Sequence, residues 1–329
     1  MRTVEDLGEK KVIAIIRDCL DSMPEMLMPF GDDVSAIRLD GGRVAVVKTD
    51  MLVGRTDVPQ GMNMRQAARK AVVMNISDFA AKGATPLIVL ASLGFPRSFT
   101  EEDVRQIGRG LNEGAREYGA YVVGGDTNEA SDVIISCSLL GTCGKYGIVK
   151  RSEAKPGDVV AVTGHFGKTA AGLKILLEGL TVPEKIRKPL TEAVLMPKAR
   201  LREGLALAGT GALTASIDSS DGLAWSLYEL SDASNVGFIV DDIPIVPDVS
   251  EFAEKYGFDP YGLCLYGGEE YELVMTIKPR LWEKARKAVE ATGTPLTAIG
   301  VATKEKKIEL EAGGETKPIE RKGWEHFRT

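Results

Sequence analysis

The hydrophobic and polar positions of this 329-residue chain follow two periods in turn, one typical of strands and the other of helices. Residues 34–39 and 43–49 predict two strands joined by a turn at residues 40–42. Residues 64–82 then carry apolar side chains at helical spacing, and residues 86–92 form an apolar run typical of a buried strand. The start of the chain therefore predicts strands and helices in alternation.

The same alternation continues toward the middle of the chain. Thr100 is a favourable N-cap, and the acidic residues 101–103 behind it complement the helix dipole, so we expect a helix over residues 100–118. Two apolar runs, at residues 120–123 and 132–141, predict strands. These elements together predict a first unit of mixed α/β type.

A polar segment with the sequence KRSEAKPGD, residues 150–158, predicts a boundary between two domains, because it ends in Pro and Gly. A chain of 329 residues is also long for a single core. We therefore predict an N-terminal domain over residues 1–149. Residues 150–329 would form a C-terminal domain.

The second unit repeats the mixture of strands and helices, which predicts an α/β fold (α+β mixed) for both domains. We expect strands at residues 159–163, 213–217, 236–240 and 271–277, and helices at residues 169–180, 223–231 and 279–291. The segment GHFGKT after the first of these strands resembles a P-loop, but it has two residues between its glycines where a P-loop has four. We interpret it as a strand-to-helix turn.

Composition narrows the classes of partner. The 41 basic and 47 acidic residues give a net charge of -6, which argues against non-specific binding of nucleic acid or anionic membranes. The charged start is unlike a signal peptide, and no apolar run is long enough for a membrane helix. The four cysteines are scattered and form no CxxC pair. We expect a soluble, cytoplasmic protein with reduced thiols.

Six short segments place carboxylates beside glycine, serine or threonine. They are GDD at residues 31–33, TD at 49–50, NISD at 75–78, GGDT at 124–127, DSSDG at 218–222 and GGEE at 267–270. Each alone is explained as a helix cap or a turn. Their number favours a site for several Mg²⁺ ions and phosphate groups, since Mg²⁺ prefers carboxylate and phosphate oxygens. His165 and His326 are the only histidines, which leaves little material for a hydrolase mechanism.

The order of these motifs resembles the thiamine-monophosphate kinase family, in an archaeal-type variant, within the aminoimidazole ribonucleotide synthetase-like superfamily. The resemblance covers residues 31–327 and includes NISDFAAKGATP, GGDT, DSSDGL, GGEEYEL and the closing GWEHF. It implies a two-domain architecture, in which residues 1–149 bind ATP and Mg²⁺ and form the dimer contact while residues 150–329 complete the site. It also implies transfer of the γ-phosphoryl group of ATP to thiamine monophosphate, giving thiamine diphosphate. It also implies that several Mg²⁺ ions bind, and it leaves open whether a monovalent cation binds as well. It predicts a homodimer formed through N-terminal strands.

The resemblance assigns roles to individual positions. It implies metal ligation by Asp33, Thr49, Asp50, Asp78, Asp126, Asp218 and Asp221. It places nucleotide contacts at Gly125, Asp126, Arg151 and Ser220, and thiamine phosphate contacts at Glu269 and Trp324. Without the resemblance, Arg151 reads as a solvated linker residue and Trp324 as a packing residue.

Three positions depart from the family pattern. Asp57 stands where relatives commonly have a substrate-contacting histidine, so a carboxylate would face the aminopyrimidine. Lys48 stands where a serine ligand is common, and Glu270 replaces the aspartate of GGED. We still expect direct in-line transfer supported by metal-bound Asp78 and Asp126, with no general base, because the acceptor is already an anionic phosphate.

Two alternatives remain open at this point. The chain could be another ATP-dependent member of the superfamily, such as a purine-type cyclo-ligase. It could instead be a non-catalytic protein that binds a nucleotide or a divalent metal. Product analysis separates both alternatives from a kinase.

Overall fold

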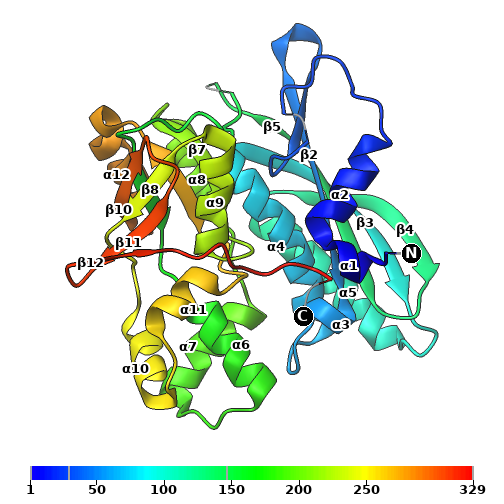
Figure 1. Ribbon diagram of the computed structural model, residues 1–329. Coiled ribbons are helices and arrows are strands. Elements are labelled where there is room, and N and C mark those ends of the chain that lie inside the picture. The colour runs from blue at the N-terminus through cyan, green and yellow to red at the C-terminus, as the bar shows by residue number, and fades with distance from the viewer. Residues whose placement is uncertain (1, 29, 146, 328–329) are drawn as a thin grey trace.

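The computed structural model describes residues 2–28, 30–145 and 147–327. Its described part contains two β-sheets with helices packed around and between them (Figure 1). The mixed α/β class and the two-domain architecture are confirmed. The predicted division at residues 149 and 150 lies in the segment that joins the two sheets, and its exact position stays a prediction.

The first sheet has five strands in the order β1-β2-β5-β3-β4. They are β1 (Ser35–Arg38), β2 (Val44–Val53), β3 (Ala84–Phe95), β4 (Tyr121–Glu129) and β5 (Ile134–Cys143). The predicted β1–β2 hairpin is present, and β3 with β4 forms the parallel pair of this sheet. The strand predicted at residues 120–123 continues to Glu129, so GGDT lies within β4 and is not a turn.

Helices α4 (Met64–Lys82) and α5 (Glu101–Glu117) cover one face of the first sheet. Asn63 caps α4 in a capping box with Gln66, and Gly83 ends the helix in the left-handed region at a φ of 63°. A Cβ atom on Gly110 of α5 would lie 2.1 Å from the carbonyl oxygen of Arg65. Glycine is therefore required for the close packing of the two helices.

The second sheet has seven strands in the order β12-β11-β8-β10-β6-β9-β7. They are β6 (Val159–Thr163), β7 (Leu213–Asp218), β8 (Gly237–Val240), β9 (Leu273–Ile277), β10 (Leu296–Thr303), β11 (Ile308–Ala312) and β12 (Glu315–Pro318). Strand β9 begins two residues later than predicted. The reason is that Glu269 and Tyr271 adopt left-handed φ values of 64° and 52°, which are incompatible with a strand.

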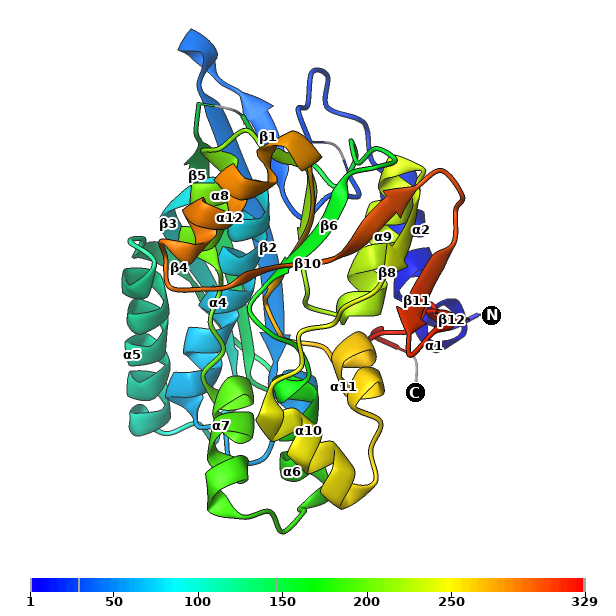
Figure 2. The ribbon, with the colours of Figure 1, turned by 90° about the vertical axis from the view of Figure 1, so that its left-hand side faces the viewer.

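Seven helices accompany the second sheet, and several escaped the sequence pattern. They are α6 (Lys168–Glu178), α7 (Glu184–Leu195), α8 (Leu201–Ala208), α9 (Leu223–Ser234), α10 (Pro247–Tyr256), α11 (Pro260–Tyr266) and α12 (Trp282–Glu290). Figures 1 and 2 both place α6, α7, α10 and α11 together at one end of the molecule, where they share a small core. The GHFGKT segment is the predicted strand-to-helix turn, leading from β6 into α6.

Helix α4 packs between the two sheets, which explains why its residues are buried on nearly every side. The short helices α1 (Val4–Leu7) and α2 (Glu9–Asp18) lie beside the C-terminal segment, and the backbone N–H of His326 donates to Glu9. Among the described helices, none is long and apolar enough to cross a membrane.

Candidate active site

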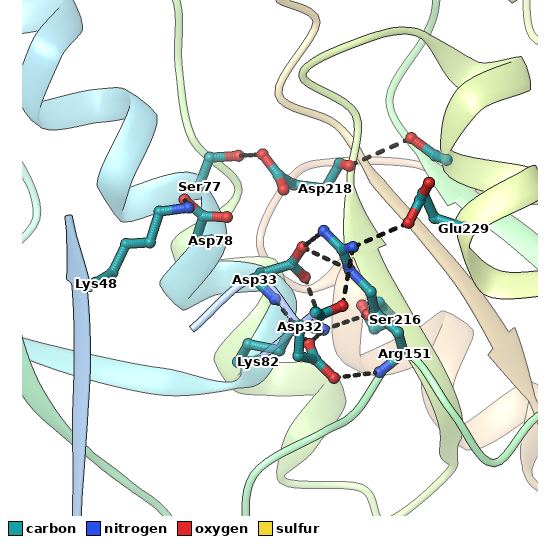
Figure 3. A network of polar contacts seen from close by, with 12 residues as sticks. Asp32, Asp33, Lys48, Ser77, Asp78, Lys82, Arg151, Ser216, Asp218 and Glu229 are labelled. Carbon is teal, nitrogen blue, oxygen red and sulfur yellow. Dashed lines mark hydrogen bonds and ion pairs between the residues drawn. The ribbon is translucent and has the colours of Figure 1, made fainter. Parts of the chain in front are cut away.

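Three buried carboxylates meet where α4 contacts both sheets. Asp33 comes from the loop before β1, Asp78 from α4, and Asp218 from the end of β7. One oxygen of each carboxylate lies within 4.8 Å of the others (Figure 3). Ser77 on α4 donates a hydrogen bond of 2.6 Å to Asp218 Oδ2, which links α4 to the second sheet. Residues that lie far apart in the sequence thus form one cluster.

Lys82, at the end of α4, neutralises one side of this cluster. Its side chain is completely buried, and Nζ lies 2.7 Å from Asp32 Oδ1 and 2.7 Å from Asp33 Oδ2. The same ammonium group donates a 2.6 Å hydrogen bond to the carbonyl oxygen of Ser216. The ammonium group therefore contacts three oxygen atoms, and it donates a well-directed hydrogen bond to the Ser216 carbonyl oxygen.

Arg151 also contacts the Asp33 carboxylate. Its Nε donates a 2.8 Å hydrogen bond to Asp33 Oδ1, and Nη1 lies 3.3 Å from Glu229 Oε2. Burial alone would raise the pKa of Asp33, but the charges of Arg151 and Lys82 lower it to about 2. Asp33 is therefore ionised throughout the physiological pH range.

Lys48 of β2 reaches the cluster from the first sheet. Its Nζ lies 3.1 Å from Asp50 Oδ1 and 3.0 Å from Asp78 Oδ2. Burial alone would lower the pKa of Lys48, but the charges of Asp78 and Asp50 raise it above its ordinary value. The Lys48 side chain is therefore charged, and it contributes a positive charge to the site.

The other carboxylates of the site have pKa values above the usual range for aspartate. Burial and the charge of Asp33 raise the pKa of Asp218 to about 6, and burial with the charge of Glu9 raises that of Asp221 to about 7. Burial also raises the pKa of Asp78, a shift that the charge of Lys48 opposes and that of Asp218 increases. Additional positive charge would relieve this repulsion.

The donor set fits divalent metal ions such as Mg²⁺. All of its candidate ligands are carboxylate oxygens, which hard cations prefer. Asp33 Oδ2 lies close to Lys82, yet it is one of three buried side-chain atoms of the described residues that accept no well-directed hydrogen bond. An unsatisfied carboxylate oxygen in a buried acidic cluster is suited to ligate a cation.

A pocket of about 460 Å³ opens from this cluster. One wall consists of Glu9, Lys10 and Ile13 from α2, together with the C-terminal residues 324–326. Trp225 on α9 contributes an aromatic face, and Lys10 Nζ lies 4.1 Å from its ring centroid. The pocket thus combines a cationic and acidic floor with aromatic walls.

Eight of the predicted site residues line this pocket: Asp33, Asp50, Asp78, Arg151, Asp218, Ser220, Asp221 and Trp324. Three others lie on the first sheet outside the pocket: Thr49, Gly125 and Asp126. Side chains alternate along a strand, so Lys48 and Asp50 face α4 while Thr49 points to the opposite face, which none of the described helices covers. Thr49 Oγ1 donates to the carbonyl oxygen of Cys137 at 3.2 Å.

Asp126 shares this helix-free outer face. The register pairs Met51 with Ser136, Ser136 with Ser92, and Ser92 with Asp126 across four strands. Adjacent strands lie about 4.8 Å apart, so Asp126 is roughly 14 Å from β2 and on the other side of the sheet from Asp50. Within one chain, Asp126 does not join the acidic cluster.

Two predicted substrate contacts are engaged within the protein. The carboxylate of Asp57 accepts a 2.7 Å hydrogen bond from the backbone N–H of Val53. Glu269 forms an ion pair with buried Lys70, which also donates to the carbonyl oxygen of Asp57 at 3.0 Å. Asp57 therefore stabilises the turn after β2. Lys70 connects the backbone at Asp57 with the side chain of Glu269.

Sequence reasoning missed Lys82, Trp225 and the residues of α2. A lysine at the end of a helix usually contacts solvent, so its burial carried no sequence signal. Trp225 lies two residues after the end of the DSSDGL motif, and this proximity was the available signal.

The raised pKa values predict how metal binding depends on pH. Divalent cations compete with protons for Asp218 and Asp221, so we expect Mg²⁺ affinity to rise from about pH 5 to about pH 8. Without metal, the folded protein retains protons on these groups that the unfolded chain loses above about pH 4. Their contribution to the free energy of unfolding therefore decreases as the pH rises through about 7, and Mg²⁺ opposes this decrease. Denaturant titrations with and without Mg²⁺ at both ends of the range measure the effect, and equal stabilisation by Mg²⁺ at both would contradict it.

Comparison with known proteins places the fold and the site in context. The N-terminal domain of AIR synthase related proteins matches residues 31–143, and the C-terminal domain matches residues 155–313. The thiamine-monophosphate kinase of Pyrococcus horikoshii is 37% identical over 300 residues, or 91% of each chain. That of Pyrococcus abyssi is 39% identical over 299 residues, or 90% of each chain.

A solved structure, AaThiL complexed with AMPPCP and TMP, matches with a TM-score of 0.86 at 28% identity and covers 99% of each chain. The similarity therefore extends over both sheets. The chain belongs to the thiamine-monophosphate kinase family, which is built from the two AIR synthase related domains.

Proposed function

We propose that this protein phosphorylates thiamine monophosphate to thiamine diphosphate, with ATP as the phosphoryl donor and several Mg²⁺ ions as cofactors. The observation that carries the proposal is the buried cluster of Asp33, Asp78 and Asp218 at the floor of an aromatic-walled pocket. The relatives support it, because they are named for this activity and one was solved with an ATP analogue and TMP.

The residues of the site would act by positioning and by electrostatics. Mg²⁺ bound by Asp33, Asp78 and Asp218 would neutralise the charge of the triphosphate. Arg151 offers guanidinium donors at the edge of the cluster, a geometry suited to phosphate oxygens. The acceptor is itself a phosphate anion, so alignment of donor and acceptor accounts for most of the rate, and no protein base is required.

The decisive experiment is incubation of the protein with ATP, Mg²⁺ and thiamine monophosphate, followed by separation of the products. Thiamine diphosphate and ADP should form in equal amounts. ATP binding without any product would favour a non-catalytic nucleotide-binding protein. Hydrolysis of ATP without thiamine diphosphate would favour another reaction of the superfamily, such as that of a cyclo-ligase.

In this proposal Trp324 contacts the cationic thiazolium ring of the substrate. Its side chain lines the pocket and is 54% exposed, so one ring face is available. A cation–π contact contributes about 0.5–2 kcal/mol, so we expect Trp324→Ala to raise KM for thiamine monophosphate by about 2- to 30-fold. Trp324→Phe keeps an aromatic face and should retain most of the affinity. Equal KM values for the alanine and phenylalanine variants would contradict this role.

We also propose that the protein is a homodimer in which a second copy covers the outer face of the first sheet. This face exposes large apolar side chains: Val47, Met51, Leu90, Tyr121 and Leu140. Soluble proteins rarely leave such a contiguous apolar surface uncovered. Thr49 and Asp126 lie on the same face, so both would act at the interface, with Asp126 serving the partner's site.

Complementation between two inactive variants tests this arrangement. Asp78→Asn and Asp126→Asn proteins are unfolded together, refolded as a mixture and assayed. If Asp126 acts in the partner's site, half of the molecules are mixed dimers with one intact site, and about a quarter of the wild-type activity returns. No recovery, with mixed dimers demonstrated by mass spectrometry, would place Asp126 in its own chain's site.

A further inference from the structure

Lys48 is one of the three positions at which this chain departs from the pattern that the family resemblance implies. The resemblance leads us to expect a serine metal ligand here, whereas this chain has a lysine. In the structure its ammonium nitrogen lies 3.1 Å from Asp50 Oδ1 and 3.0 Å from Asp78 Oδ2. A positive charge of the protein therefore stands between two carboxylates that the resemblance assigns to metal ions.

The strand fixes this placement. Lys48 and Asp50 are two residues apart on β2, so their side chains leave the same face of the sheet, toward Asp78 on α4. The Lys48 side chain is 19% exposed and that of Asp78 only 9%, so water screens their ion pair little. The ammonium group is held in the gap between the sheet and the helix.

A lysine and a divalent ion compete for this position. An ion that bridged Asp50 and Asp78 would need an oxygen of each at about 2.1 Å, in the gap that the ammonium group fills. A metal ion beside the Lys48 ammonium group would also be repelled by it, and this repulsion is strong because little water is present to screen the two charges. The position can hold the Lys48 ammonium group or a metal ion, but not both.

The carboxylates of the site are already paired with positively charged side chains, so fewer metal ions are required to neutralise them. Five carboxylates converge here: Asp32, Asp33, Asp50, Asp78 and Asp218. Three protein cations are in contact with them: Lys48, Lys82 and Arg151. A large part of the negative charge is thus neutralised before any metal ion binds. One of the three protein cations, Lys48, stands at a position where the resemblance implies a metal ligand.

We propose that the ammonium group of Lys48 takes the place of one divalent cation, the one that would bridge Asp50 and Asp78. The chain then binds one divalent ion fewer per site than the same chain with serine at position 48. This inference rests on the proposed function for the identity of the site as a metal and nucleotide site. It concerns the number and position of the ions, and not the product of the reaction.

Counting bound Mn²⁺ tests the proposal without an activity assay. Equilibrium dialysis with a non-hydrolysable ATP analogue gives the number of Mn²⁺ ions per chain in the wild type and in Lys48→Ser. We expect one additional ion in Lys48→Ser and no change in Lys174→Ser, whose lysine forms an exposed pair with Glu178 on α6. Equal counts in the wild type and Lys48→Ser would overturn the proposal.

A second measurement needs only the wild type, so it decides even if Lys48→Ser does not fold. In crystals soaked with Mn²⁺ and the same analogue, anomalous scattering locates each ion. We expect peaks at the Asp33, Asp78 and Asp218 cluster and none between Asp50 and Asp78. A peak between Asp50 and Asp78 would overturn the proposal, whereas failure to form thiamine diphosphate would overturn the proposed function and leave both metal measurements valid.

Discussion

Asp78→Asn is expected to lower the rate of thiamine diphosphate formation by about 100-fold or more, the usual loss when one preorganised electrostatic group is removed. Asp78 stands at the centre of the site, because its carboxylate belongs to the buried cluster and also pairs with Lys48. Asn has the same shape but lacks the charge that ligates a cation and orients the phosphates. The loss should appear in kcat.

The fold should survive this substitution. The pKa of Asp78 is raised by burial, and a neutral amide relieves its repulsion of Asp218. Thermal unfolding without metal should therefore give a Tm equal to or above that of the wild type. Asp40→Asn, in the exposed turn before β2, is the matched control and should leave turnover unchanged. Near-normal turnover in Asp78→Asn would show that the charge of Asp78 is not required for phosphoryl transfer.

Lys82→Met is expected to reduce the free energy of unfolding by about 3–5 kcal/mol, which is the usual cost of removing one partner of a buried ion pair. Lys82 is fully buried and contacts Asp32, Asp33 and the carbonyl oxygen of Ser216. Methionine fills a similar volume but leaves the charge of Asp33 without this partner. Denaturant titration of both proteins without metal measures the difference.

Two comparisons separate this effect from general damage. Lys174→Met removes an exposed ion pair on α6 and should cost less than about 1 kcal/mol. Saturating Mg²⁺ should restore part of the stability of Lys82→Met, because a cation at the cluster compensates Asp33. A loss below about 1 kcal/mol would show that Lys82 is not a structural counter-charge.

Local patterns predicted much of the first domain. The hairpin, α4 and α5 agree with the structure because their signals lie within a few residues, such as Thr100 with its acidic first turn. The sequence pattern did not indicate α7, α8, α10 and α11, which are short and pack against each other or against α4. Their helical state depends on contacts between distant segments, which no local period records.

The acidic cluster was predicted from the order of its motifs, and the geometry of the strands decided the rest. Asp33, Asp78 and Asp218 converge as expected. The resemblance implies metal ligation by both Thr49 and Asp50, yet adjacent residues of a strand point to opposite faces. The GGDT segment reads as a turn because of its glycines, but its pairing with β3 makes it a strand.

Helix α4 also limits how this sequence can change in length. Lys70, Asp78 and Lys82 lie on one helix of 19 residues, and each contacts a different segment of the chain. Insertion or deletion of one residue between them would turn the following side chains by about 100° and shift them by about 1.5 Å. Loops elsewhere can gain or lose residues, whereas the stretch from Lys70 to Lys82 must keep its length for the two halves of the site to stay in register.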